Sequence, residues 1–208
     1  MDFYDVLIVG AGHGGAQAAI SLRKNKFIGS IGVIDAGFEH PYERPPLSKE
    51  YLAGKKEFGR LQIRPRDFWA KNDIDLHLGL QVLRLGGGKK SVVLDDGREV
   101  SFGQLIWAAG GRARNLAGPS ALSDSVHVLR DKRDADALRK ALDAGVERVV
   151  IIGGGYIGLE AAAVLSAMGV RVTVVEAFDR VLSRVAGAEI GEFFQTLHRS
   201  HGAQIVLE

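Results

Sequence analysis

Two G-x-G-x-x-G patterns carry the residues whose spacing could do chemistry. The first pattern has Gly10, Gly12 and Gly15, with Gly14 inside it, and the second pattern has Gly153, Gly155 and Gly158. In such a turn the first glycine permits the tight bend, the second lets backbone approach a pyrophosphate, and the third lets a helix pack on a strand. The N-terminus of that helix offers unpaired N–H groups and a partial positive charge to the phosphates. The patterns predict two dinucleotide-binding turns.

An acidic residue follows each turn near the expected offset of about 20 residues. Asp35 lies 25 residues after Gly10 (35 − 10), and Glu176 lies 23 residues after Gly153 (176 − 153). Each acid ends an apolar run, where a carboxylate can bind the ribose hydroxyls of a nucleotide. Both acids are therefore candidate cofactor-binding residues.

Glu176 also bears on the choice of cofactor. A carboxylate at this position would repel a 2′-phosphate, so the second turn favours NADH over NADPH. Arg180 and Arg184 lie nearby in the sequence and weaken this preference, and Arg184 is a further candidate for contact with the cofactor.

Short apolar runs rich in valine and isoleucine surround both turns and are typical of buried parallel strands. We expect strands at 4–9, 31–34 and 105–111 and from 149 onward, with a last strand at 203–207. We expect helices at 14–24, 131–143 and 188–200, and short helical turns at 48–52 and 66–72. Between about 76 and 102 the pattern changes to short alternating strands, where Asp96-Gly97 is a hairpin signal. The fold class is therefore α/β, with two Rossmann-like three-layer units, parallel sheets and an antiparallel β-meander inserted in the first.

Composition excludes several functions. The chain has no cysteine, so a structural disulfide, a cluster held by cysteines and a redox-active dithiol are excluded. The net charge of +2 is spread along the chain, so no nucleic-acid partner is expected. No charged leader or long apolar run appears, which predicts a cytoplasmic protein without membrane contact. The six histidines are scattered, and the spacing of His198 and His201 does not predict a metal site.

The stretch "PYERPPLSKEYLAGK", from Pro41 to Lys55, makes the interpretation more specific. Together with the first glycine turn, the Asp-Gly hairpin, "AAGGRAR", "VLRDKRDADAL" and "VVIIGGGYIGLEAAA", it resembles the FAD-dependent ferredoxin, rubredoxin and putidaredoxin reductases over essentially the whole chain. The sequence departs from their pattern in two places. Ala109 replaces the threonine of A-T-G, and Asp35 is shifted by one residue from the usual acid.

The resemblance implies a set of cofactor contacts in addition to the two turns. Arg44 and Lys49 would contact FAD, with Arg44 on the pyrophosphate and Lys49 near the flavin ring. Val82 and Arg130 would be further FAD contacts. Tyr156 and Ile157 would lie along the nicotinamide cofactor. Glu160 would meet the nicotinamide amide and pair with Lys49 across the flavin, and these two residues are the only catalytic candidates.

The resemblance also implies a function. Residues 1–113 would form part of an FAD-binding domain, and residues 114–208 an incomplete NAD-binding domain. Electrons would pass from NADH through FAD to a ferredoxin-type iron–sulfur protein that serves an oxygenase. The chain corresponds to the N-terminal half of such reductases, so we expect part of a sheet to be unpaired and a homo-oligomer to be able to cover it. Alternatives are an NADH:quinone or monodehydroascorbate-type reductase and a non-catalytic or redox-sensing nucleotide-binding fragment.

Overall fold

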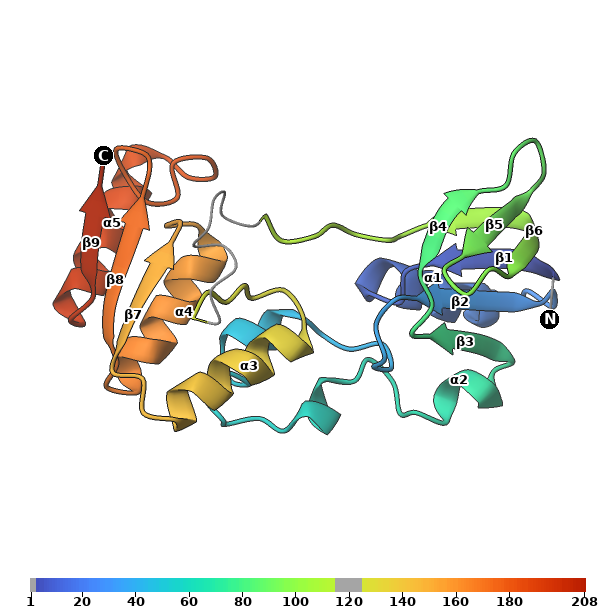
Figure 1. Ribbon diagram of the computed structural model, residues 1–208, viewed down its shortest axis with the longest axis horizontal. Coiled ribbons are helices and arrows are strands. Elements are labelled where there is room, and N and C mark those ends of the chain that lie inside the picture. Colours follow the sequence, from blue (N-terminus) through green and yellow to red (C-terminus); the bar gives the residue numbers. More distant parts are fainter. Residues whose placement is uncertain (1–2, 115–124) are drawn as a thin grey trace. The chain divides into compact units, whose positions relative to one another are not determined.

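The computed structural model describes residues 3–114 and 125–208, which divide into two compact units (Figure 1). The first unit consists of Met1–Glu43 and Gly59–Arg112, and the second of Arg44–Phe58 and Ala113–Glu208. The segment Arg44–Phe58 lies between the two parts of the first unit in sequence and yet packs within the second unit. In the described part of the chain, no helix has both the length and the apolar character that crossing a membrane requires.

Six strands form the sheet of the first unit. They are β1 (Phe3–Val9), β2 (Ile31–Asp35), β3 (Ile74–Leu78), β4 (Val82–Leu85), β5 (Ser91–Leu94) and β6 (Glu99–Trp107). Their spatial order is β3-β2-β1-β6-β5-β4. The strands β3, β2, β1 and β6 are parallel, and β4 and β5 continue the sheet in antiparallel pairing. The expected α/β class is confirmed, as a mixed sheet.

The antiparallel meander is not a separate insertion, because one long strand belongs to both parts of the sheet. The runs expected as two strands, "REVSF" and "LIWAAGG", are joined in β6. Its first residues pair antiparallel with β5, with Ser101 opposite Ser91, while Ser101 to Trp107 run parallel to β1. Gly103 permits this continuity, because a Cβ there would lie 2.7 Å from the carbonyl oxygen of Asp5.

The sequence pattern does not predict β3 as a parallel strand. Its stretch "IDLHL" overlaps the start of the expected meander, but it pairs in parallel with β2, with Ile74 opposite Ile31. Before it lie a 3-10 turn, η2 (Phe58–Leu61), and a short helix, α2 (Phe68–Lys71). The alternation in β3 resembles that of a hairpin strand, so the pattern alone does not distinguish the two pairings.

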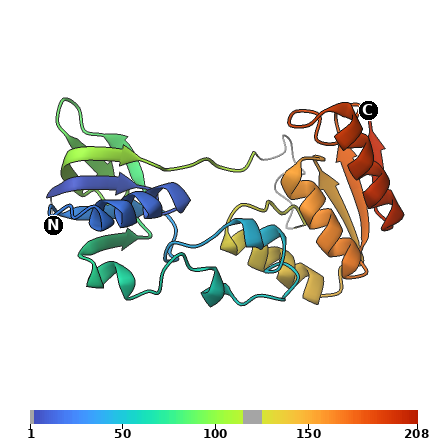
Figure 2. The same ribbon diagram turned by 180° about the vertical axis from the view of Figure 1, so that it is seen from behind.

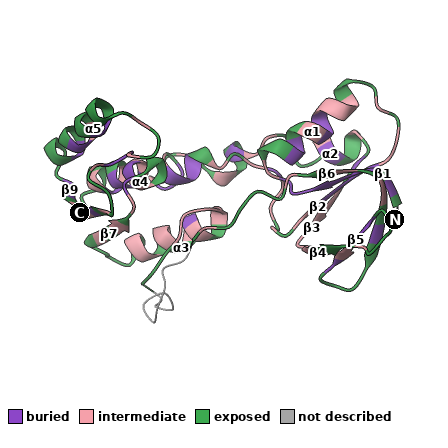
Figure 3. Ribbon diagram, turned by 90° about the horizontal axis from the view of Figure 1, so that it is seen from above, coloured by how far each residue is buried: buried purple, intermediate pink, exposed green. Residues whose placement is uncertain are grey.

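The sheet of the first unit contains buried residues (Figure 3), which form a separate apolar cluster on each face. Helix α1 (His13–Lys24) packs its small residues on one face, where Ala16 and Ala19 are fully buried with Ile8 and Val33. On the other face, residues of the meander, including Leu94, pack on β1 and β2. Coverage of both faces fixes the register of β1 and β2, and therefore the position of the turn between β1 and α1.

The second unit has a parallel sheet of three strands, in the order β7-β8-β9. Its elements are η1 (Pro45–Ser48), α3 (Lys132–Asp143), β7 (Arg148–Ile152), α4 (Tyr156–Ala167), β8 (Arg171–Glu176), α5 (Ala188–Ser200) and β9 (Gln204–Leu207). Figure 2 shows α4 and α5 on the same face of this sheet, where Val172, Val174 and Ile205 are buried. On the opposite face of β7, Val150 and Ile152 are 64% and 63% exposed.

A polar cluster in the first unit joins the buried Tyr4 to the exposed Asp75 and the half-buried His77. The Tyr4 hydroxyl lies 3.0 Å from Oδ2 of Asp75 and 2.6 Å from Nε2 of His77. The tyrosine ring crosses β2 at Gly32, where a Cβ would lie 2.6 Å from the ring. Burial raises the pKa of Tyr4 above its ordinary value and lowers the pKa of His77, although Asp75 opposes the second shift.

This cluster predicts a pH-dependent stability. The pKa of His77 in the folded chain lies below its ordinary value of about 6.5, so the unfolded chain takes up the proton more readily. The free energy of unfolding should therefore fall as the pH drops below about 6.5. The variant His77→Gln should show a smaller fall between pH 7.5 and 5.5 in urea titrations. His40 and His198, whose pKa values burial also lowers, should preserve part of the dependence. An equal fall in variant and wild type would contradict the role of His77.

Candidate nucleotide-binding sites

The first glycine turn joins β1 to α1 and contains two approaches that only glycine allows. Gly10 has φ +103°, and a Cβ on it would lie 2.3 Å from the carbonyl oxygen of Ala108. A Cβ on Gly15 would lie 1.8 Å from the carbonyl oxygen of Gly10. The Gly10 N–H donates to the Ile34 carbonyl at 2.7 Å, which fixes the turn at the end of β2. These contacts bring the N-terminus of α1 to the carboxyl edge of the sheet.

The second turn, between β7 and α4, repeats this geometry. Gly153 has φ +107°, and its N–H donates to the Val175 carbonyl at 2.8 Å. A Cβ on Gly158 would lie 2.1 Å from the carbonyl oxygen of Gly153. The turns differ at the first glycine, because a Cβ on Gly153 would meet no described atom within 4 Å. The fold therefore requires the third glycine in both turns, and steric contact with a neighbouring strand restricts the first glycine only in the first turn.

The middle glycines, Gly12 and Gly155, are not required by the fold. They are the N-cap residues of α1 and α4, with φ −68° and −83°, values that any residue adopts. A Cβ on either glycine would meet nothing within 4 Å among the described residues. The space that a Cβ would fill is the space that a pyrophosphate needs when it approaches the backbone. Both turns therefore fit a dinucleotide.

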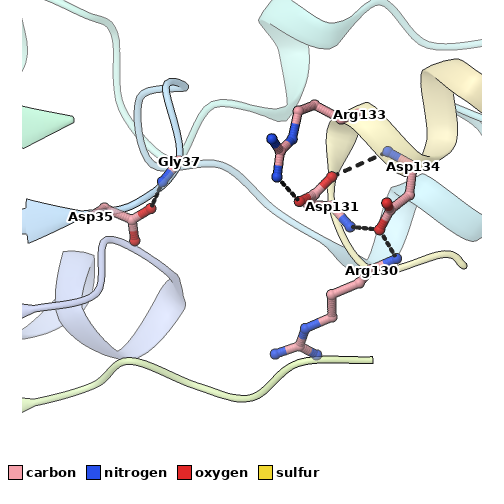
Figure 4. Close-up of polar contacts among 6 residues, drawn as sticks. All are labelled: Asp35, Gly37, Arg130, Asp131, Arg133 and Asp134. Carbon is pink, nitrogen blue, oxygen red and sulfur yellow. Dashed lines mark hydrogen bonds and ion pairs between the residues drawn. The ribbon is translucent and has the colours of Figure 1, made fainter. Parts of the chain in front are cut away.

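The acids after the two turns occupy equivalent positions. Oδ2 of Asp35 accepts a hydrogen bond from the Ala11 N–H at 2.6 Å, and Oε2 of Glu176 accepts one from the Gly154 N–H at 2.7 Å. Each donor directly follows the first glycine of its turn. The one-residue shift of Asp35 in the sequence therefore does not remove it from the turn. Its Oδ1 also accepts from the Gly37 N–H at 2.7 Å (Figure 4).

Arg130 is held by its backbone, while part of its side chain has no partner. Its N–H donates to Oδ2 of Asp134 at 2.8 Å, next to the capping box that Asp131 and Asp134 form at the start of α3 (Figure 4). The guanidinium extends away from these acids, and its buried Nε has no hydrogen-bond partner in the described part of the chain. A buried donor on a cation is costly to leave unpaired, so this position fits an anionic ligand.

Lys49 and Glu160 form the expected ion pair within the second unit. Nζ of Lys49 lies 2.7 Å from Oε1 of Glu160, so the two side chains are in direct contact. Glu160 lies one helical turn after the start of α4, and Lys49 directly follows η1. Sequence reasoning missed Ser48, whose hydroxyl donates to Oε2 of Glu160 at 2.6 Å. Its place directly before Lys49, in the loop that carries the resemblance, was the available signal.

The segment Arg44–Phe58 is attached to α3 as well as to α4. The Tyr51 hydroxyl lies 2.5 Å from Oδ1 of Asp136, and the Arg139 guanidinium lies 5.1 Å from the centre of the Tyr51 ring. Leu52 is 1% exposed and belongs to the apolar cluster of α4 and β8. The Arg44 side chain has no hydrogen-bond or ion-pair partner among the described residues. The segment is therefore ordered by its own unit, and Arg44 is available to a ligand.

The remaining predicted residues lie on three different elements. Tyr156 and Ile157 begin α4 and are 60% and 50% exposed. Val82 is the first residue of β4, opposite Leu94. The Arg184 guanidinium lies 4.8 Å from the centre of the Phe178 ring, in the loop after Glu176. Arg184 lies in the loop whose Leu182 N–H donates to the Gly154 carbonyl of the second glycine turn at 2.9 Å, and Val82 lies in the first unit.

Two glycine turns with matching acids are typical of the class of proteins with Rossmann-type dinucleotide-binding folds. Residues 4–208 match the model of the pyridine nucleotide-disulphide oxidoreductases, and the chain belongs to this family. The expected resemblance to the ferredoxin reductases is confirmed by the relatives described next.

A ferredoxin–NAD(P)(+) reductase from a Sphingomonas species is 54% identical over 204 residues, which are 98% of this chain and 49% of the relative. Putidaredoxin reductase from Pseudomonas putida is 38% identical over 97% of this chain and 48% of its own length. Among solved structures, the covalent complex of putidaredoxin reductase with putidaredoxin contains a chain that matches with a TM-score of 0.93 and 37% identity. That match covers 99% of this chain and 49% of the other. The chain thus spans about half the length of these relatives.

Proposed function

We propose that this chain provides the dinucleotide-binding turns of a flavoprotein reductase that takes electrons from NADH and passes them through FAD to a ferredoxin-type iron–sulfur protein. The observation that carries the proposal is the pair of open positions at Gly12 and Gly155, which the fold does not need and a pyrophosphate does. The bound cofactors supply the redox chemistry, and the residues of the chain bind and orient them.

The first turn is the candidate for FAD. Gly10, Gly12, Gly14 and Gly15 and the acid Asp35 would bind its adenosine and pyrophosphate, as the resemblance implies. Arg44 and Arg130 belong to the second unit and are proposed as FAD contacts on the resemblance alone. Val82 is proposed as a backbone neighbour of the adenine, on the resemblance alone.

The second turn is the candidate for NADH. Oε2 of Glu176 accepts from the Gly154 N–H, while Oε1 has no partner among the described residues and can accept from a ribose hydroxyl. Arg180 contacts Asp179 and the Ser183 carbonyl, and Arg184 stacks on Phe178. The buried Nε of Arg180 has no hydrogen-bond partner among the described residues, but its terminal nitrogens do, so the carboxylate should dominate and disfavour a 2′-phosphate.

The charge of Glu176 can be tested with the variant Glu176→Gln, which retains an oxygen for the Gly154 N–H. We expect the ratio of NADH affinity to NADPH affinity to fall about tenfold, the effect of removing one partly exposed charge about 4 Å from a phosphate. Isothermal titration calorimetry with both nucleotides measures this ratio. A ratio unchanged from wild type would show that Glu176 does not set the preference.

A ferredoxin-type partner is proposed because the relatives at 54% and 38% identity are named as ferredoxin and putidaredoxin reductases. A homo-oligomer is proposed for the exposed face of β7, where Val150 and Ile152 are open to solvent. The cytoplasmic location stays a prediction from the sequence.

The proposed function can be tested with the purified chain. The protein is incubated with FAD, desalted, and examined by absorbance before and after anaerobic addition of NADH. A retained flavin band that bleaches with NADH, followed by reduction of an added [2Fe–2S] ferredoxin, would support the proposal. A protein that binds NADH but retains no flavin would contradict the reductase function for this chain. That result would favour the alternative of a non-catalytic nucleotide-binding module.

A further inference from the structure

Ser48 is a buried serine whose hydroxyl is directed to a carboxylate. Its exposed fraction is 5%, and its Oγ lies 2.6 Å from Oε2 of Glu160. The Pro45 carbonyl is the other possible acceptor, at 3.4 Å. A hydroxyl has one proton to donate, and the shorter contact to a charged acceptor is the stronger one. Ser48 therefore holds one oxygen of Glu160 independently of Lys49.

Lys49 and Ser48 contribute differently to the position of Glu160. The lysine reaches Oε1 at 2.7 Å, but the two side chains of the ion pair are 40% and 32% exposed. An ion pair exposed to this degree is screened by water, and a lysine ammonium sits on a flexible four-carbon stem. A buried serine has a single side-chain rotation before its hydroxyl. The lysine therefore balances the charge of Glu160, while the serine determines where its carboxylate points.

The backbone around Ser48 is fixed by the second unit. Pro45 and Pro46 restrict φ in η1, and Leu47 is 2% exposed. On the other side of Ser48, Tyr51 is bound to Asp136 of α3. The hydroxyl of Ser48 is thus presented to α4 by a segment that is attached on both sides of it.

We propose that Ser48 is a positioning residue that fixes the Glu160 carboxylate for contact with the nicotinamide cofactor, an inference that rests on the proposed function and on the nicotinamide contact that the resemblance implies for Glu160. Glu160 lies one turn after Tyr156 at the start of α4, and both oxygens of its carboxylate retain a lone pair after the bonds to Ser48 and Lys49. An acceptor held in one orientation binds an amide donor without first losing side-chain freedom.

The test compares NADH affinity in four proteins: wild type, Ser48→Ala, Glu160→Ala and the double variant. We expect Ser48→Ala to weaken NADH binding about tenfold. This loss is the lower end of the effect of one hydrogen bond to a charged group, because water can reach Glu160 and replace part of the bond. In the Glu160→Ala background, Ser48→Ala should cause no further loss. Ser48→Thr, which retains the hydroxyl, should bind NADH as the wild type does.

A matched control is Ser166→Ala in the same helix, α4. Its Oγ is buried without a hydrogen-bond partner among the described residues, so removal of this hydroxyl breaks no bond. NADH affinity should be unchanged in this variant. A double-mutant cycle on the free energy of unfolding, without nucleotide, measures the Ser48–Glu160 coupling separately.

The outcomes separate the two levels of the argument. If the wild type binds NADH and Ser48→Ala binds it equally well, the positioning role is overturned and the proposed function is not. If Ser48→Ala weakens binding by the same factor with and without Glu160, Ser48 does not act through Glu160, and the inference is also overturned. If the wild type binds no NADH, the proposed function fails and the positioning role fails with it, while the unfolding cycle still reports whether the hydrogen bond exists.

Discussion

Replacing Gly155 by alanine is expected to weaken NADH binding roughly 10- to 100-fold while leaving the thermal midpoint of unfolding unchanged. The backbone of Gly155 has an ordinary φ of −83°, and a Cβ would meet no described atom within 4 Å, so the free protein tolerates the change. The added methyl group would instead occupy the space that a pyrophosphate enters. A steric overlap of this kind costs about 1–3 kcal/mol, which corresponds to that loss of affinity. Calorimetric titration with NADH and a thermal melt measure the two quantities.

The chain offers a control for Gly155→Ala in the same unit. Gly187 is the N-cap of α5, with φ −66° and no described atom within 4 Å of a Cβ, but it belongs to neither glycine turn. Gly187→Ala should therefore leave NADH affinity as in the wild type. In the first unit, Gly12→Ala should weaken FAD binding in the same way. Wild-type NADH affinity in Gly155→Ala would refute the assignment of the second turn.

The two turns could be predicted from the sequence because their requirements are local. A first glycine with positive φ, a third glycine against a backbone carbonyl and an acid at the end of the next strand are all set within about 25 residues. The structure repeats this geometry in both turns, with matching hydrogen bonds from Ala11 to Asp35 and from Gly154 to Glu176. The one-residue shift of Asp35 from the family pattern does not change this geometry, because its carboxylate still accepts from the N–H that follows the first glycine.

Long-range pairing could not be predicted in the same way. The segment Arg44–Phe58 belongs to the second unit through Leu52, Tyr51 and Ser48. The hydrogen-bond partners of Tyr51 and Ser48 lie more than 80 residues later in the sequence. No local pattern in the segment indicates a distant helix. The continuity of β6 depends in a similar way on Gly103, which lets the strand pass close to Asp5.

Replacing Gly15 by alanine is expected to destabilise the first unit, in contrast to the effect at Gly12. A Cβ on Gly15 would lie 1.8 Å from the carbonyl oxygen of Gly10, and this oxygen is part of the turn and cannot rotate away. Relief of the overlap requires α1 to move from β1, which would open the contacts of Ala16 and Ala19. We expect a loss of about 3 kcal/mol or more in the free energy of unfolding, the upper range for overpacking in a close-packed interior.

The neighbouring position provides the control for this prediction. A Cβ on Gly14 would lie 3.9 Å from the Cβ of Ala108, an ordinary contact, and the residue is in the same turn of α1. Gly14→Ala should therefore gain about 0.5–1 kcal/mol, because alanine loses less backbone freedom than glycine in a helix. Urea titrations of both variants measure the difference. If Gly15→Ala proved as stable as Gly14→Ala, α1 would not be held against β1 by the third glycine, and a packing role for Gly158 in the second unit would be equally doubtful.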